Sequence, residues 1–309
     1  MQKYLFLSPV YKEMIWGGKK LHTIFGFEIP SDNTGEAWVI SAHKNGDCLI
    51  KNGEFQGKTL SYVYENHKEL FGNSKDIVFP LLAKIIDANN DLSIQVHPED
   101  EYARKHANDL GKTECWYILD ALPNSYIIYG HNAKTKEELI NLINKNEWEK
   151  LLKKVNAKKG DFIYVPAGTV HAICKGLLIL EIQQSSDTTY RFYDYNREDT
   201  NGNKRQLHLK EAVDVMKTPH IDYEVSPKIE MIGNTKITEL ITSPYFHVSK
   251  INIVDEFMLT NPTYLLINVI DGHGIVDGLE IKKGDAFVVT SAAKSIKIIG
   301  NLEILSSRI

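Results

Sequence analysis

The chain has 309 residues, enough for one large or two ordinary domains, and 43% of them are hydrophobic. Its formal net charge of −4 argues against binding to nucleic acid or to a membrane surface. Three scattered cysteines, an N-terminal apolar run too short for a signal peptide, and no run of membrane-spanning length predict a cytoplasmic protein without a disulfide framework.

Short strands account for most of the predicted structure. Segments rich in β-branched and aromatic residues alternate with Gly, Asn, Asp and Pro. They cover residues 37–42, 77–86, 92–97, 115–122, 125–130, 161–167, 172–184, 264–270 and 286–290. Strands and helices do not alternate as they do in parallel sheets. The sequence therefore predicts a mainly β fold, a sandwich or barrel with helical insertions.

Four segments are predicted to be helical. A stripe of apolar residues indicates a helix over 59–71. A short helix is expected over 98–107, with its proline at the first helical position. A capping-box pattern opens a predicted helix over 135–154. A less regular pattern indicates a fourth helix over 209–216.

The sequence contains one internal repeat. Lys158 and Lys282 each open a Lys-Lys-Gly-Asp turn that is followed by an apolar strand. His171 in the first copy corresponds to Ser295 in the second. We infer two related β-barrel domains, with a site kept only in the first. The alternative is that Lys-Lys-Gly-Asp is a common hairpin turn without further meaning.

Polar residues at the ends of predicted strands are candidates for a metal site. Gln95 and His97 share one face of a strand, with Cα atoms about 6.6 Å apart. Glu114 is two residues before the apolar Trp116, so both are expected on the interior face of one strand. An interior carboxylate needs a cation, hydrogen bonds or a metal. His97, Glu114 and His171 together form a two-histidine, one-glutamate set of the kind that binds catalytic zinc. Gln95 could add an oxygen ligand to this set. The alternative for each histidine is a hydrogen-bonded core residue.

A second group of residues suits an anionic substrate. Lys84 lies in an otherwise apolar run, and a buried lysine is rare unless it is paired. Lys112 lies two residues before Glu114 and is expected on the same face of the strand. Ser93 is expected on the same face as His97. Lysine and serine near a metal would suit a phosphate ester. Alternatively, Lys84 extends along the strand to reach water.

The polar and aromatic segment 185–197 follows a strongly apolar strand. It supplies Asp187, Arg191 and Arg197. Loops that follow barrel strands often carry functional residues. The alternative is a surface loop whose tyrosines pack on the rim of the barrel.

Four motifs resemble the type I phosphomannose isomerases, the zinc-dependent mannose-6-phosphate isomerases. They are Leu-Ser-Ile-Gln-Val-His-Pro from Leu92, Gly-Lys-Thr-Glu from Gly111, Val-Pro-Ala-Gly-Thr-Val-His from Val165, and the segment 185–197. The match spans most of the first 200 residues. The resemblance implies two cupin-type jelly-roll barrels with helical insertions, a catalytic domain at 1–235 and a domain without a metal site at 236–309.

The resemblance also implies roles for single residues in metal, phosphate and sugar binding. It places the ligands of one zinc ion at Gln95, His97, Glu114 and His171, the active-site arginine at Arg191, phosphate-binding groups at Lys84 and Ser93, and groups of the sugar pocket at Lys112 and Asp187. Lys112, Asp187 and a bound water remain open as the proton-transfer base.

The implied reaction interconverts mannose 6-phosphate and fructose 6-phosphate through an enediol. The expected partner is therefore a small sugar phosphate. Two alternatives remain open at this point: a metal-dependent cupin isomerase of another sugar phosphate, and a sugar-binding cupin without activity. The complete ligand set together with Arg191 favours an enzyme.

Overall fold

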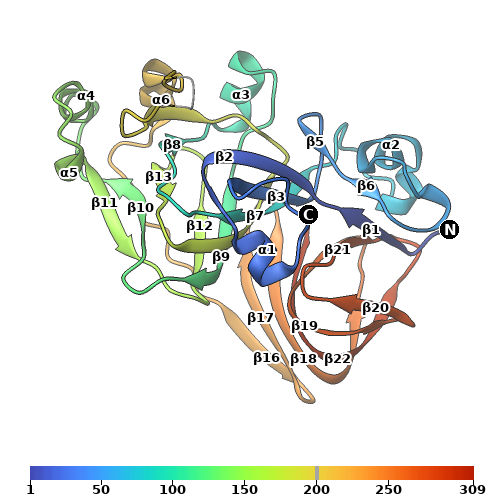
Figure 1. The fold of residues 1–309 in the computed structure, drawn as a ribbon. Coiled ribbons are helices and arrows are strands. Elements are labelled where there is room, and N and C mark those ends of the chain that lie inside the picture. The colour runs from blue at the N-terminus through green and yellow to red at the C-terminus, as the bar shows by residue number, and fades with distance from the viewer. Residues whose placement is uncertain (199–201) are drawn as a thin grey trace.

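Strands dominate the computed structural model, which describes residues 1–198 and 202–309 (Figure 1). The predicted mainly β class is confirmed. None of the helices in the described part has the length and hydropathy that a membrane crossing requires. Cys48, Cys115 and Cys174 are buried free thiols, as expected for a chain without a disulfide framework.

Two sheets face each other in the first part of the chain. One has six strands in the order β12 (Phe162–Val165), β9 (Glu114–Ala121), β14 (Leu177–Gln184), β7 (Leu81–Asp87), β3 (Thr34–Ile40) and β2 (Val10–Gly18). The other has five, in the order β11 (Leu152–Asn156), β10 (Tyr126–His131), β13 (His171–Ile173), β8 (Ile94–Val96) and β15 (Tyr190–Tyr193). Trp116 and Ile179 of the first sheet and Ile127 and Ile173 of the second belong to one buried cluster. The two inner faces therefore share a core.

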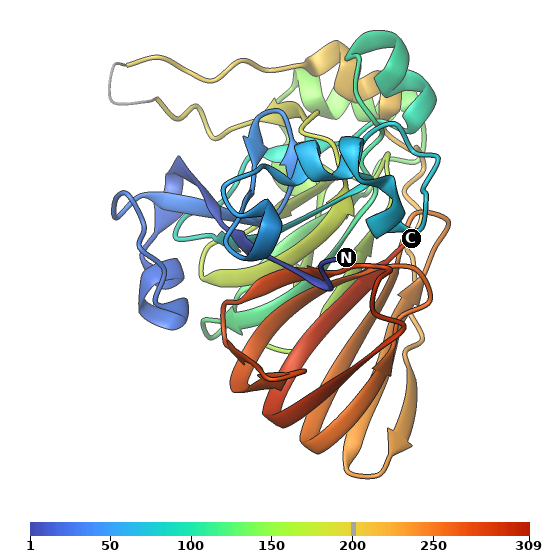
Figure 2. The same cartoon turned by 90° about the vertical axis from the view of Figure 1, so that its right-hand side faces the viewer.

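A nine-stranded sheet contains the other strands of the described residues, except one small hairpin. Its order is β16 (Lys228–Ile232), β17 (Thr235–Thr242), β18 (His247–Thr260), β22 (Ser295–Arg308), β19 (Leu265–Val276), β21 (Ala286–Val289), β1 (Tyr4–Ser8) and β6 (Leu49–Ile50), with β20 (Leu279–Lys282) paired to β19. The strands drawn in orange and red lie beneath the first two sheets in Figures 1 and 2. The hairpin joins β4 (Ala42–His43) and β5 (Gly46–Asp47).

Strand pairing connects the start of the chain with its end. Tyr4 pairs with Val289 in β21, and Leu7 pairs with Ile50 in β6. Leu5 and Leu7 are buried in the core between the six-stranded and nine-stranded sheets. The predicted boundary between residues 235 and 236 stays a prediction. In the structure it falls at the start of β17, whose first five residues pair with β16.

The two copies of the sequence repeat form the same turn. The backbone N–H of Lys158 donates to Asp161 at 2.9 Å, and that of Lys282 donates to Asp285 at 2.9 Å. The glycine between them has φ of 90° in the first copy and 94° in the second, a left-handed conformation that favours glycine. A strand follows each turn, and the next begins at the matching position, His171 or Ser295. The similarity thus extends beyond the turn itself.

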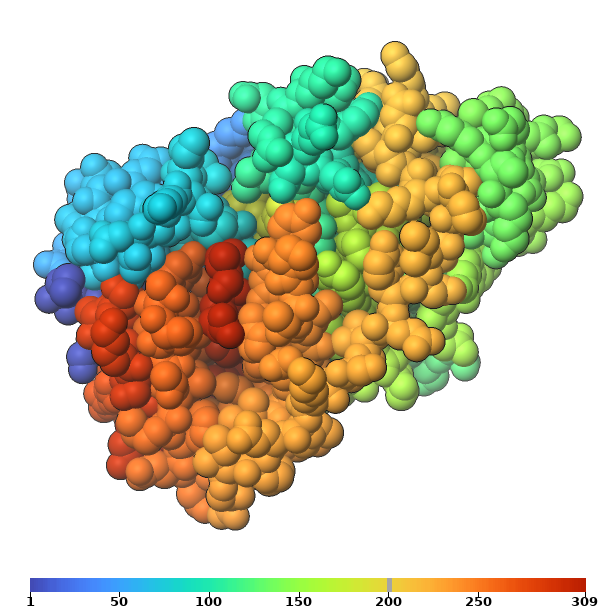
Figure 3. Space-filling view, turned by 180° about the vertical axis from the view of Figure 1, so that it is seen from behind, coloured from blue at the N-terminus to red at the C-terminus, as the bar shows by residue number. Residues whose placement is uncertain are grey.

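Helices cover the outer face of the five-stranded sheet. They are α3 (Asp100–His106), α4 (Lys136–Asn144), α5 (Trp148–Leu151) and α6 (Leu209–Val215). Leu139 and Ile143 of α4 and Ala212 of α6 share a buried cluster with Ile94 and Val96 of β8. Seen from behind, the segment after α6 crosses the surface from these helices to the nine-stranded sheet (Figure 3). The part of this face formed by β8 is therefore closed to solvent.

Several predicted elements differ from the structure in their extent. The segment 135–154 is divided, because Asn146 has φ of 55° and ends the helical path; α5 and β11 follow. Pro98 lies outside α3, whose N-cap residue is Glu99. The segment 172–184 contains two strands separated by a turn at Gly176, which has φ of 94°.

Other helices agree with the predictions or were not predicted. The segment 59–71 contains α2 (Leu60–Asn66) and the 3₁₀ helix η2 (Lys68–Phe71), and α6 lies within 209–216. The helix α1 (Lys20–Phe25) and the 3₁₀ helix η1 (Gly53–Phe55) were not predicted. Both are short, so they carry little periodic signal.

Candidate metal centre and substrate pocket

Three neighbouring strands of the five-stranded sheet place polar residues in one row. Gln95 in β8 pairs directly with His171 in β13 on one side and with Arg191 in β15 on the other. His97 follows β8 by one residue, and Glu114 is the first residue of β9 in the facing sheet. The candidate ligands thus come from both sheets and meet between them.

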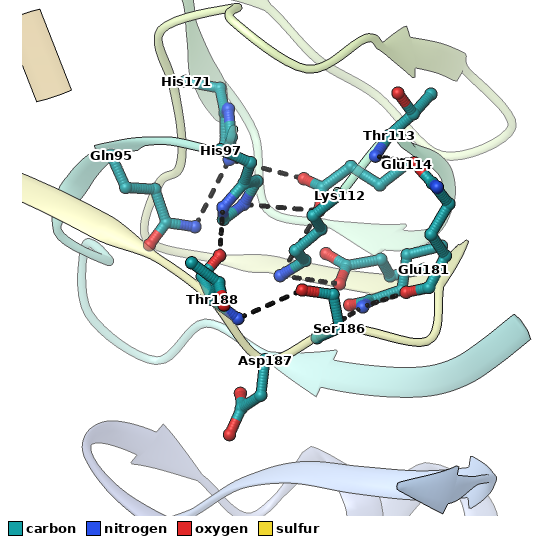
Figure 4. Close-up of polar contacts among 12 residues, drawn as sticks. Gln95, His97, Lys112, Thr113, Glu114, His171, Glu181, Ser186, Asp187 and Thr188 are labelled. Atoms are coloured by element: carbon teal, nitrogen blue, oxygen red, sulfur yellow. Dashed lines mark hydrogen bonds and ion pairs between the residues drawn. The ribbon is translucent and has the colours of Figure 1, made fainter. Parts of the chain in front are cut away.

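The two histidines contact opposite oxygens of one carboxylate (Figure 4). His97 Nε2 lies 3.5 Å from Glu114 Oε2, and His171 Nε2 lies 3.3 Å from Glu114 Oε1. All three side chains are at most 1% exposed. Within the described residues, this is the one group of three or more His, Cys, Asp or Glu side chains whose ligand atoms come close enough to share a metal ion.

Backbone carbonyls fix the tautomer of both histidines. His97 Nδ1 lies 3.0 Å from the carbonyl oxygen of Thr188, and His171 Nδ1 lies 2.9 Å from that of Thr169. Because a carbonyl can only accept, each Nδ1–H donates and each Nε2 keeps its lone pair for the centre. His97 Nε2 and Glu114 Oε2 are buried without a hydrogen-bond partner. A nitrogen–oxygen set of this kind fits a zinc ion.

The Gln95 amide reaches the same centre. Its Nε2 lies 3.3 Å from His171 Nε2. A half-turn of this amide would exchange its nitrogen for Oε1, the atom that can coordinate a cation. The geometry thus allows Gln95 to act as a fourth ligand.

Burial shapes the protonation of the candidate ligands. It lowers the pKa of His171 to about 4 and that of His97 well below its ordinary value, helped by the nearby Lys112. Burial and the negative charge of Glu181 raise the pKa of Glu114 to about 8. The histidines are therefore neutral at pH 7, as metal ligands must be, and a bound cation would favour the ionised Glu114.

Two buried lysines form an ion-pair network beside these ligands. Lys84 Nζ lies 3.0 Å from Glu181 and 3.8 Å from Glu36. Lys112 Nζ lies 3.5 Å from Glu114 and 3.9 Å from Glu181. Burial alone would lower the pKa of Lys84, but Glu181 and Glu36 raise it above its ordinary value. Lys84 is 6% exposed, so the alternative in which it reaches for water is wrong.

A cavity of about 290 Å³ opens beside the network. Six residues singled out in the sequence line it: Lys84, Ser93, Gln95, Lys112, Asp187 and Arg191. Glu36, Glu181, Arg205 and His208 also line it and were missed. Glu36 and Glu181 could have been noticed, since each is the only charged residue in a mostly apolar strand. Arg205 and His208 lie in a polar segment without such a signal.

The segment 185–197 places only some of its charged residues at the cavity. Arg191 Nε donates to Ser93 Oγ at 3.1 Å. Asp187 is exposed at the rim, where it accepts a hydrogen bond from Asn45 at 2.8 Å. Arg197 instead pairs with Asp194 at 2.5 Å and does not line the cavity. The surface-loop alternative therefore fits Arg197 but not Arg191.

A regular strand over residues 92–97 would place Leu92, Ile94 and Val96 on the face opposite Ser93, Gln95 and His97. The structure follows this alternation only in part. Ile94 and Val96 pack against the outer helices, as one face of a strand should. Leu92, expected on that same face, instead packs with Trp16 in the inner core and lines the cavity. The reason is that β8 begins at Ile94, so the two-residue period does not extend back to Leu92.

Comparison with known proteins identifies the family. The model of the type I phosphomannose isomerase catalytic domain matches residues 5–144, and that of the mannose-6-phosphate isomerase cupin domain matches residues 236–309. The mannose-6-phosphate isomerase of Bacillus subtilis is 49% identical and that of Streptococcus mutans 48%, each over 99% of this chain and 98% of the relative. The chain belongs to the type I phosphomannose isomerase family.

Solved structures of the phosphomannose isomerase family have the same fold. The crystal structure of the mannose 6-phosphate isomerase from Bacillus subtilis superimposes with a TM-score of 0.98 at 44% identity, over 100% of both chains. Phosphomannose isomerase from Salmonella typhimurium gives a TM-score of 0.79 at 16% identity, over 99% of both chains. The second likeness concerns the fold alone. These matches confirm the mainly β, cupin-type class inferred from the sequence.

The metal-free protein should be most stable near pH 6.5. Between pH 4.5 and 6.5 the unfolded chain binds protons on His97 and His171, whereas the folded chain holds one on Glu114. The unfolded state thus binds more protons than the folded state, and stability should fall as the pH decreases. Between pH 6.5 and 8 only the Glu114 proton remains, so stability should fall as the pH rises.

Urea denaturation of the metal-free protein from pH 5 to 8 checks this optimum. Burial also lowers the pKa values of other histidines, which add to the loss at low pH: His43, His131, His208, His220 and His247. Stability that continued to rise from pH 6.5 to 8 would contradict the raised pKa of Glu114. Saturation with zinc serves as the control, since a cation at Glu114 should remove the decline above pH 6.5.

Proposed function

We propose that this protein is a zinc-dependent isomerase that interconverts mannose 6-phosphate and fructose 6-phosphate through an enediol. One observation carries the proposal: the buried His97–Glu114–His171 cluster adjoins a cavity whose lining combines two lysines and two arginines with three carboxylates. The metal cluster alone would suit many reactions, and the polar cavity alone many ligands. Their combination in a chain of this family favours a sugar phosphate.

Four side chains would hold the metal. They are His97, Glu114, His171 and Gln95. When bound, zinc supplies Lewis-acid stabilisation of the negative charge that develops on the sugar oxygens at C1 and C2. No change of oxidation state is needed for this role.

Lys84 and Ser93 are proposed to bind the phosphate. The Lys84 ammonium makes one short contact, to Glu181 at 3.0 Å, so it has further N–H donors for the cavity. The Ser93 oxygen accepts from Arg191, which leaves its hydroxyl hydrogen free to donate. Arg205 adds a second guanidinium to the cavity wall. Together these groups offer an anion several charge-assisted hydrogen bonds.

Arg191 is proposed to stabilise the oxyanion of the enediolate. It lies directly beside Gln95 in the sheet, and its Nε is fixed by Ser93. A guanidinium held in this way needs little rearrangement during the reaction. Lys112 and Asp187 are the candidate acid–base groups that move the proton between C2 and C1; Lys112 is buried against Glu114, and Asp187 lies at the rim.

Elemental analysis combined with a coupled assay tests the proposal. We expect the purified protein to contain one zinc ion per chain and to turn over mannose 6-phosphate. Exhaustive chelation should remove both the metal and the activity, and added zinc should restore them. Full activity after chelation would refute the metal role, and faster turnover of glucose 6-phosphate would refute the substrate assignment.

A further inference from the structure

Asp109, in the loop after α3, binds a segment that lies beside the proposed metal ligands. Its Oδ1 accepts the backbone N–H of Leu110 at 2.8 Å. Its Oδ2 accepts three donors of one short segment: Ser186 Oγ at 3.0 Å, Asp187 N at 3.2 Å and Thr188 Oγ1 at 2.8 Å. Burial by itself would raise the pKa of Asp109. The hydrogen bonds have the larger effect and lower this pKa below its ordinary value, so the carboxylate is ionised at pH 7.

The segment 186–188 contributes twice to the proposed site (Figure 4). The carbonyl oxygen of Thr188 lies 3.0 Å from His97 Nδ1, and Asp187 lines the cavity. The Thr188 carbonyl selects the His97 tautomer whose Nε2 faces the centre. The hydrogen bond from Thr188 Oγ1 therefore connects Asp109 to His97 through a single residue.

The other histidine shows why this support is needed. His171 Nδ1 is bound by a carbonyl only two residues away, at Thr169, so local backbone fixes that contact. The carbonyl on His97 comes from a segment 91 residues away in the sequence. Besides Asp109, the Gln183 amide holds this segment by donating to the Ser186 carbonyl at 2.6 Å. Asp109 supplies the contacts nearest to Thr188.

We propose that Asp109 is a positioning residue for the metal centre. By fixing residues 186–188, it holds the Thr188 carbonyl against His97 and orients the imidazole for metal binding. The same contacts hold Asp187 at the cavity. This inference rests on the proposed metal site and adds a residue that touches neither the metal ligands nor the cavity.

Zinc affinity of Asp109→Ala, measured by competition with a chromophoric chelator, tests the role. Replacing residues that orient metal ligands typically costs 10–100-fold in metal affinity, and we expect about tenfold here because Asp109 acts through Thr188. Asp285→Ala is the matched control: this carboxylate also caps a loop, by accepting the Lys282 N–H at 2.9 Å, but it lies in the nine-stranded sheet region. It should lose thermal stability without losing zinc affinity.

A double variant separates positioning from a general loss of stability. Thr188→Val combined with Ser186→Ala removes both hydroxyl donors but keeps the Thr188 carbonyl, and zinc affinity should fall as in Asp109→Ala. Adding Asp109→Ala to this pair should then cost less than it does alone. Should Asp109→Ala fail to fold, Asp109→Asn keeps the shape and is measured in the same way.

The outcomes of these experiments distinguish the role of Asp109 from the proposed zinc site on which it rests. Parent-like zinc affinity in Asp109→Ala, or an equal loss in Asp285→Ala, would overturn the positioning role and leave the metal site intact. A parent protein that bound no zinc would overturn the metal site, and the role of Asp109 with it.

Discussion

Replacing His97 with alanine should abolish zinc binding and isomerase activity together. The substitution removes one of three buried ligand atoms and leaves Glu114 and His171 as an incomplete set. Lewis-acid stabilisation is worth several kcal/mol, and about 4 kcal/mol corresponds to a thousandfold loss of kcat. Elemental analysis of the purified variant and its kcat at saturating mannose 6-phosphate measure the two effects.

His131→Ala is the matched control for this variant. His131 is also a buried histidine, 5% exposed, and contacts the carbonyl oxygen of Lys217 at 3.0 Å, away from the proposed ligands. Its loss should lower thermal stability but leave zinc content and kcat close to those of the parent. Retention of zinc by His97→Ala, or an equal loss of activity in His131→Ala, would contradict the assignment.

Replacing Arg191 with alanine should lower kcat by about 10²–10³ and leave zinc bound. Loss of one fixed donor to a developing oxyanion has an effect of this size in other enzymes. Zinc should be retained because Arg191 lies beside Gln95 in the sheet and is not itself a ligand. Steady-state kinetics and elemental analysis of the same preparation provide both measurements.

Two further variants sharpen the role of Arg191. Arg191→Lys keeps the charge but loses the planar fork, so it should recover only part of the activity. Arg197→Ala removes a guanidinium that pairs with Asp194 outside the cavity, and its kcat should stay close to that of the parent. If Arg191→Ala raised KM without lowering kcat, Arg191 would bind the substrate without favouring the transition state.

The features of the fold that depend on nearby residues, such as strands, shared faces and helix caps, could be predicted from the sequence. The strand around Lys84, the shared face of Glu114 and Trp116, and the helix N-cap at Thr135 are all present. The capping box is incomplete, because the Glu138 carboxylate accepts the backbone N–H of Lys134 and not that of Thr135.

The end of α4 was missed because it depends on one left-handed residue, Asn146, which leaves no periodic apolar signal. The strand β16 was missed although Ile229 and Met231 alternate with Lys228 and Glu230 in its sequence.

The candidate site was predictable only residue by residue. The sequence singled out Lys84 as a buried lysine that needs a partner, but the partner, Glu181, is set by the pairing of β14 with β7. The family resemblance supplied the grouping of the ligands, which spacing alone left open. Asp109 gave no signal, because its importance depends on a segment 79 residues further along the chain, at Thr188.

The place of β1 in the nine-stranded sheet has a consequence for the rate of folding. Tyr4 pairs with Val289, so two segments that lie about 285 residues apart in the sequence must meet before β1 can join the sheet. Leu5 and Leu7, which are buried in the folded protein, stay exposed until then. Contacts between such distant parts of a chain slow folding and prolong the exposure of apolar strands. During folding, β1 is therefore open to pairing with the wrong strand for longer than the hairpin strands of the same sheet.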